Sequence, residues 1–115
     1  MNLTHDEFYN PITQSLAIVQ ALFDNYQRTK FPERPPEFFS LELCGEAGEL
    51  ANLEKKRWKG KAVPLEALED EAADVLIALM NYANARGMHL GNAVSAKLVR
   101  IEEKRAALEA QGESY

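Results

Sequence analysis

Apolar residues recur every three or four positions along most of the chain, and this spacing predicts α-helices rather than strands. The first predicted helix runs from near Ile12 to Thr29. Pro32, Pro35 and Pro36 then interrupt the pattern, because proline lacks the amide hydrogen that a helix interior requires. The sequence therefore predicts one long helix followed by a proline-rich turn.

Three more helices are predicted after this turn. They run from Pro36 or Glu37 to about Trp58, from Leu65 to Arg86, and from Leu90 to Ala110. A proline suits the first position of a helix, and Gly60, Gly87 and Gly112 stand just past the three ends, where glycine is favoured. Four helices with short connections predict an all-α fold, a four-helix antiparallel bundle.

Length and composition indicate one globular domain spanning residues 1–115. Hydrophobic residues make up 46% of the chain and charged residues 27%, which is ordinary for a globular protein. The net charge of −5 argues against a nucleic acid polymer as partner, since dedicated binders are usually basic. No apolar run approaches the ~20 residues of a membrane span, and "MNLTHDEFYN" lacks the features of a signal peptide. We therefore expect a cytoplasmic protein with no membrane partner.

The third predicted helix is apolar on nearly every side. Its main stripe includes Leu68, Val75 and Leu79, yet Ile77 and Met80 stand on the opposite side. One small bundle can hardly cover a helix of this kind completely. We therefore expect a homo-oligomer, a dimer or a tetramer built from dimers, in which another subunit covers part of it.

Two pairs of carboxylates stand out against this apolar background. Glu46 and Glu49 occupy one predicted helix, and Glu71 and Asp74 the next, each pair on one helical face because of its i, i+3 spacing. Asp74 is the only charged residue from position 72 to 85, and an isolated carboxylate in an apolar helix is costly without a cation nearby. Together the two pairs predict a site for a hard divalent cation.

The remaining acids near these pairs have simpler roles. Glu66, Glu69 and Asp70 begin the third predicted helix and are expected to complement its dipole. Glu42 is either a fifth acidic contributor or a solvated or salt-bridged residue, and Cys44 is expected to pack as a small apolar side chain. These assignments leave the two pairs as the candidate site.

An all-oxygen ligand set favours Mg²⁺, with Mn²⁺ as a substitute, over zinc or copper. Di-iron helical bundles use Glu-x-x-His pairs, but neither His5 nor His89 stands three residues after a glutamate. Magnesium held by carboxylates usually completes its shell with water and substrate phosphates. Hydrolysis of a phosphoanhydride is therefore the reaction class that the acids predict.

The segments "GEAGELANL" and "EDEAADVLIALMNYANARGMHL" resemble the MazG-like, all-α nucleoside triphosphate pyrophosphohydrolases. That family carries ExxE followed by ExxD, which here would be Glu46–Glu49 and Glu71–Asp74. The similarity covers about Ile12 to Arg105. It implies a helical bundle that forms dimers or tetramers. It also implies Mg²⁺-dependent cleavage of a nucleoside triphosphate to the monophosphate and pyrophosphate, with the four acids as metal ligands and catalytic residues.

The resemblance also implies roles for residues outside the acid pairs. Asn81 would contact metal-linked water or nucleotide, although it could equally be a polar residue hydrogen-bonded between helices. Lys97 would reach a phosphate, or else is a solvated lysine. The family often follows this lysine with Asn and Arg, whereas this chain has Ile101 and Lys104, so Lys104 or the adjacent Arg105 would replace the missing arginine.

The run "KKRWKGK" closes the second predicted helix. It is either a cationic helix end favoured by the dipole, or a binding element in which Trp58 stacks on a base while Lys59 approaches phosphate. Phe38 and Phe39 have two interpretations as well, as core residues or as part of a base pocket.

The sequence leaves open two alternatives to a housecleaning pyrophosphohydrolase. One is a phosphoribosyl-ATP pyrophosphatase-like enzyme, which would share the fold but take a larger substrate. The other is a non-catalytic helical oligomerisation or regulatory module, which would show neither hydrolysis nor a Mg²⁺ effect on melting.

Overall fold

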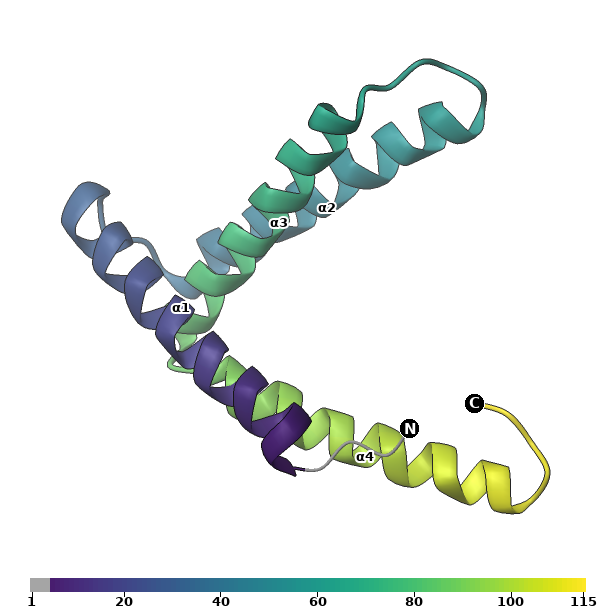
Figure 1. The fold of residues 1–115 in the computed structure, drawn as a ribbon. Helices are drawn as coiled ribbons and strands as arrows, with labels where there is room; N and C mark the ends of the chain where they lie inside the picture. The colour runs from purple at the N-terminus through teal and green to yellow at the C-terminus, as the bar shows by residue number, and fades with distance from the viewer. Residues whose placement is uncertain (1–4) are drawn as a thin grey trace. The chain divides into compact units, whose positions relative to one another are not determined.

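The computed structural model describes residues 5–115, and over this range it contains four long α-helices and no strand (Figure 1). A short π-helical turn, η1 (His5–Tyr9), leads into α1 (Asn10–Lys30). The other helices are α2 (Pro36–Trp58), α3 (Leu65–Arg86) and α4 (Leu90–Ala110). The all-α prediction is therefore confirmed, and the last three helices have the predicted limits.

The glycines at the helix ends have the backbone conformation that the sequence predicted for them. Gly60, Gly87 and Gly112 all have positive φ angles, of 91°, 74° and 76°. At the end of α2 the amide of Gly60 donates to Arg57 O and the amide of Lys61 donates to Lys56 O, both over 3.0 Å. This pair of bonds is a Schellman motif, which satisfies carbonyls that the helix leaves without partners.

The described chain divides into two compact units, one formed by Gln20–Gly87 and the other by residues 5–19 together with Met88–Tyr115. In the first unit, α2 and α3 pack along their length as an antiparallel hairpin (Figure 1). Its buried apolar residues are Phe39, Ala78, Met80 and Ala83. The arrangement of all four helices as one bundle stays a prediction.

The second half of α1 is joined to α3 by side-chain amides. Gln20 Nε2 donates to Asn84 Oδ1 over 3.0 Å, and Asn84 Nδ2 donates to the backbone oxygen of Gln20 over 2.9 Å. One turn earlier on α3, Asn81 Nδ2 donates to Gln27 Oε1 over 3.3 Å. These polar contacts favour one alignment of the two helices, because a shift of one helix along the other would leave buried amides unpaired.

In the other unit, the start of α1 crosses α4 at very short range. Thr13 Oγ1 and Ser95 Oγ are 2.6 Å apart and share a hydrogen bond, and both oxygens lie within hydrogen-bonding distance of Tyr9 O, at 3.0 and 3.3 Å. Gly91 makes this crossing possible, since a Cβ built on it would lie 2.5 Å from the backbone oxygen of Thr13.

Farther along α4, Arg105 pairs with Glu102 and Glu109.

Adding one methyl group at the crossing of α1 with α4 should therefore destabilise the protein. We expect Gly91→Ala to lower the free energy of unfolding by about 1–3 kcal/mol, because the contacting atom belongs to backbone and cannot rotate away. Gly45→Ala in α2 is the matched control: nothing lies within 4 Å of its new Cβ, so better helix propensity should stabilise by ~0.5–1 kcal/mol. Thermal unfolding followed by circular dichroism measures both, and equal melting temperatures would contradict the close crossing.

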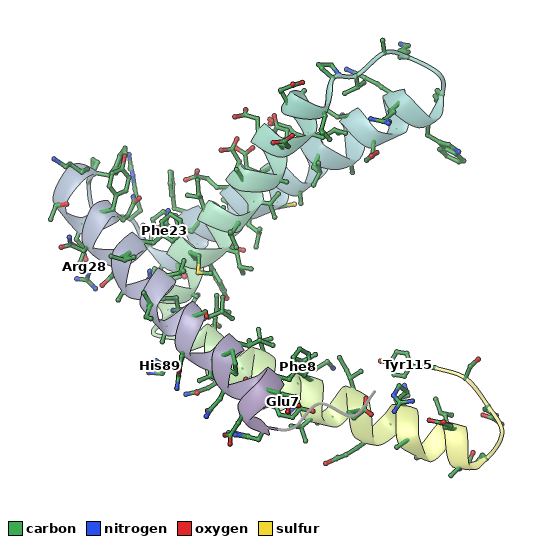
Figure 2. The ribbon with its side chains drawn as sticks, in the orientation of Figure 1. Glu7, Phe8, Phe23, Arg28, His89 and Tyr115 are labelled. Carbon is green, nitrogen blue, oxygen red and sulfur yellow. The ribbon has the colours of Figure 1, made fainter. Side chains whose placement is uncertain are left out.

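The end of the chain beyond α4 folds back onto a basic side chain. The ring of Tyr115 (labelled in Figure 2) lies 5.3 Å from the ammonium of Lys104. Over the described residues, no helix combines the length and apolar character that crossing a membrane requires.

Candidate metal centre

Carboxylates occupy positions of the α2–α3 seam where the helical pattern otherwise places apolar residues. On α2 beyond Pro36, the residues at least partly buried recur at positions 39, 43, 46, 50 and 53, and four of these are Phe or Leu. The fifth is Glu46. On α3, Glu71 and Asp74 are half-buried beside Leu68 and Val75 in the same way. The hairpin therefore holds ionisable groups in its seam.

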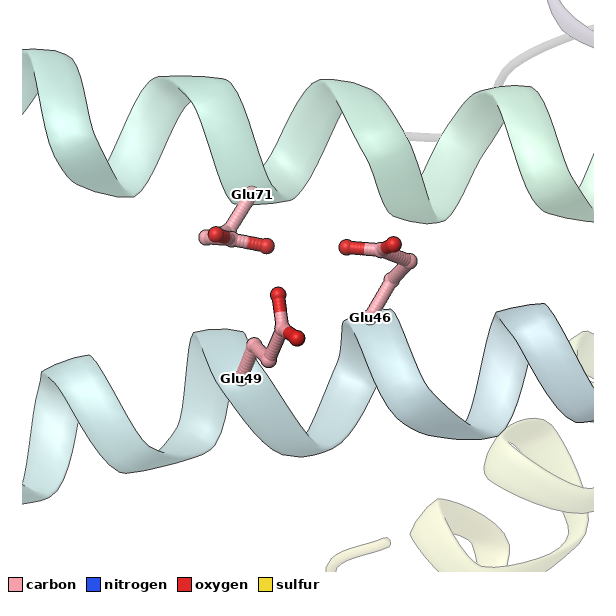
Figure 3. A group of neighbouring side chains, drawn as sticks. All are labelled: Glu46, Glu49 and Glu71. Carbon is pink, nitrogen blue, oxygen red and sulfur yellow. The ribbon is translucent and has the colours of Figure 1, made fainter.

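Three of these acids converge between the two helices. Glu46, Glu49 and Glu71 each offer a carboxylate oxygen, and these oxygens all lie within 4.8 Å of one another. Figure 3 shows Glu46 and Glu49 reaching from one helix toward Glu71 on the facing helix. The predicted meeting of the two motifs is thus present for three of the four acids, at the distance at which one cation can contact all three.

The fourth acid, Asp74, belongs to a second group that shares a member with the first. Oxygens of Asp70, Glu71 and Asp74 also lie within 4.8 Å of one another. Glu71 therefore links the two groups. From the sequence, Asp70 was expected only to complement the helix dipole, although its i, i+4 spacing to Asp74 puts both acids on one face of α3.

The crowded carboxylates of the cluster repel one another when all are ionised, so the cluster favours binding either a proton or a metal cation. Oε2 of Glu46 and Oε2 of Glu71 are buried, and neither has a hydrogen-bond partner among the described residues. Burial raises the pKa of Glu71 to about 7, and contacts with Glu46 and Glu49 act in the same direction. The pKa of Glu46 is also raised: a hydrogen bond from Glu71 lowers it, but burial and the charges of Glu49 and Asp74 outweigh that bond.

The donor set fits a hard divalent cation. All contributing atoms are carboxylate oxygens, two of them are buried without a donor, and Glu49 keeps contact with solvent. Such oxygens suit Mg²⁺ or Mn²⁺, and an exposed ligand leaves room for water and phosphate in the coordination shell. A cation would also compensate the burial and the repulsion between carboxylates that together raise the two pKa values.

The residues predicted to contact substrate are spread over several parts of the fold. Asn81 is buried and its amide bonds to Gln27, as in the alternative of a polar residue joining helices. Trp58 and Lys59 are exposed at the end of α2, about 14 Å along the helix axis beyond Glu49. Their roles as substrate contacts stay predictions.

Lys97 and Lys104 lie on α4, in the other unit, and both are exposed. Lys104 contacts the Tyr115 ring. Their approach to a phosphate also stays a prediction. Glu42 is exposed and lies outside both acidic groups, and Cys44 is exposed rather than packed.

Comparison of the chain with models of known protein families, with curated proteins and with solved structures finds no match. Its function must therefore be inferred from the chain's own residues and from the resemblance of its two motifs.

Proposed function

We propose that this protein is a Mg²⁺-dependent nucleoside triphosphate pyrophosphohydrolase, which converts a triphosphate and water into the monophosphate and pyrophosphate. The observation that carries the proposal is the acidic cluster in the α2–α3 seam, with two buried carboxylate oxygens that lack donors. A seam filled with leucine would be the more stable structure, so acids at these positions point to a function. The resemblance of the two motifs to the MazG-like enzymes supplies the substrate class.

The four acids would divide the work according to their exposure. All four would hold the metal, with Glu46, Glu71 and Asp74 half-buried in the seam and Glu49 exposed beside it. Bound Mg²⁺ would neutralise charge on the phosphates and lower the pKa of a coordinated water. Glu49 is exposed at the edge of the cluster and would accept a proton from an attacking water, with Glu46 as the other candidate.

In this reaction the water oxygen forms a bond to phosphorus, and the bond from phosphorus to the bridging oxygen breaks. The departing pyrophosphate carries the negative charge that develops, and cationic side chains would stabilise it. The resemblance of the motifs assigns this role to Lys97, with Lys104 in place of the arginine that the family carries. Trp58 and Lys59 would contact the base and a phosphate, while Asn81 would align the nucleotide or metal-linked water.

We also propose that the protein works as a homo-oligomer. Leu41 on α2 is 75% exposed, and Leu76 and Ile77 on α3 are exposed at 47% and 40%. Large apolar side chains outside the hairpin seam fit the expectation that a second subunit covers part of α3. Sedimentation measurements should give a mass of at least two chains, and a monomer at micromolar concentration would contradict this proposal.

The proposed reaction is tested by a panel of canonical and modified nucleoside triphosphates, assayed for pyrophosphate release with Mg²⁺ and with EDTA. We expect Mg²⁺-dependent formation of monophosphate and pyrophosphate in equal amounts, and no product in EDTA. Mn²⁺ should restore activity, because it accepts the same oxygen ligands.

Two results would replace this proposal with its alternatives. Hydrolysis of phosphoribosyl-ATP alone would indicate the related pyrophosphatase. No hydrolysis of any substrate, together with a melting temperature that Mg²⁺ does not change, would indicate a non-catalytic helical module.

A further inference from the structure

The free end of the α2–α3 hairpin carries a dense group of positive charges, here called the cationic tip. It consists of the five basic residues around Trp58, namely Lys55, Lys56, Arg57, Lys59 and Lys61. All five side chains are exposed, and Trp58 itself is 87% exposed. The sequence alone allows two interpretations of this run, a helix-dipole effect or a direct contact with nucleotide.

Cations elsewhere in the same unit are mostly engaged. Arg28 pairs with Asp24 over 2.9 Å, and Arg86 pairs with Glu37 over 3.3 Å. Arg34 lies 4.8 Å from the centre of the Phe38 ring. The cationic tip differs from these residues, because within residues 5–115 none of its five members has an ion pair.

The helix dipole accounts for only part of the tip. Lys55, Lys56 and Arg57 lie in the last turn of α2, where the dipole favours cations. Lys59 and Lys61 follow that turn, and the amides of Gly60 and Lys61 already satisfy carbonyls at the helix end. The dipole therefore gives no reason for two more unpaired lysines beyond the cap.

A triphosphate substrate meets an electrostatic obstacle on this protein. The chain has a net charge of −5, and the proposed site itself is built from carboxylates. The cationic tip belongs to the same hairpin, and Lys55 and Lys56 are six and seven residues beyond Glu49, about 9–11 Å along the axis. At that distance, the positive charges of Lys55 and Lys56 attract an approaching anion, although the two side chains would not contact an anion bound at the metal site.

We propose that the cationic tip is an electrostatic steering element, which attracts the polyphosphate chain of the substrate toward the acidic cluster. This inference rests on the proposed function for the identity of the anion. Lys55 and Lys56 act on the rate and affinity of encounter at a distance, whereas the direct contact with a phosphate in the proposed function belongs to Lys59. The effect of Lys55 and Lys56 must therefore fade as salt rises, whereas the effect of a direct contact at the metal site would persist.

The size of the expected effect follows from Coulomb attraction with salt screening. For two lysines about 15 Å from a bound polyphosphate, the attraction changes affinity about 3- to 10-fold at an ionic strength of ~10 mM. At ~0.15 M the same attraction changes affinity less than about 2-fold, because the screening length falls from about 30 Å to about 8 Å.

The test compares Lys55→Gln/Lys56→Gln with the control Arg28→Gln/Lys30→Gln, which removes the same number of positive charges at the end of α1. Calorimetry measures the binding of inorganic tripolyphosphate with Mg²⁺ at the two ionic strengths. Steady-state kinetics measures kcat/KM for the best nucleoside triphosphate under the same conditions. We expect the tip variant to lose about 3- to 10-fold in both quantities at low salt and to match the wild type at ~0.15 M, while the control loses less.

Three results would overturn the inference: no loss at low salt, an equal loss at both salt concentrations, or the same loss in the control. The calorimetric measurement of tripolyphosphate binding tests this inference separately from the proposed function. If no triphosphate is hydrolysed but tripolyphosphate binding shows the expected salt dependence, the proposed reaction is wrong and the steering element stands.

Discussion

Replacing Glu49 by Gln should reduce pyrophosphate release by on the order of 10²–10⁴-fold, because the amide can neither accept a proton from water nor bind the metal as a carboxylate does. The fold should be unaffected. Glu49 is exposed, so its replacement leaves no buried group without a partner. The measurement is Mg²⁺-dependent pyrophosphate release, with melting temperature as the test of folding.

Glu54→Gln is the matched control for this experiment. Glu54 is exposed on the same helix and belongs to neither acidic group, so the variant should keep full activity. Activity retained in Glu49→Gln, or lost equally in both variants, would be incompatible with the proposed role.

Asp74→Asn should also abolish activity, since Asp74 is a half-buried member of the second group.

The metal-free protein should become less stable as pH rises from about 4.5 to about 7. The pKa of Glu71 is raised from 4.5 to about 7 in the folded state, so the folded chain binds a proton that the unfolded chain has already lost. The stabilisation from that proton is fully present below pH 4.5 and disappears as pH passes 7. Melting in EDTA at several pH values measures the trend, and a melting temperature that rises over this interval would refute it.

Glu71→Gln should remove most of this pH dependence, because the amide does not titrate. Its melting temperature in EDTA at a pH of about 7.5 should exceed that of the wild type, since one source of repulsion within the cluster is gone. Mg²⁺ should then reverse the order. At about 100 times its dissociation constant, Mg²⁺ should raise the melting temperature of the wild type by on the order of 10 °C, and that of the variant by much less.

Local signals sufficed to predict the helices. Proline at position 36 and glycine at positions 60 and 87 mark boundaries through their own backbone restrictions, so three helices have the predicted limits. Helix α1 begins at Asn10, two residues before the approximate start predicted near Ile12, and nothing in the sequence indicated η1, which precedes it.

The candidate site was predictable where helical spacing decides it. The i, i+3 motifs placed Glu46 and Glu71 on facing surfaces, and the structure brings their carboxylates together. The contribution of Asp70 to the second acidic group was not predicted, because the helix dipole alone explains an acid at the start of a helix. The bond from Asn81 to Gln27 depends on how α1 lies against α3, which no local pattern specifies.

The exposed Trp58 at the end of α2 has a spectroscopic consequence. It is the only tryptophan of the chain, and at 87% exposure its indole is surrounded by water already in the folded state. Tryptophan emission should therefore change little when the protein unfolds, and melting experiments need circular dichroism or calorimetry instead. The same emission should change when a polyphosphate or a base approaches the cationic tip. The intrinsic fluorescence of Trp58 should therefore report ligand binding while changing little on unfolding.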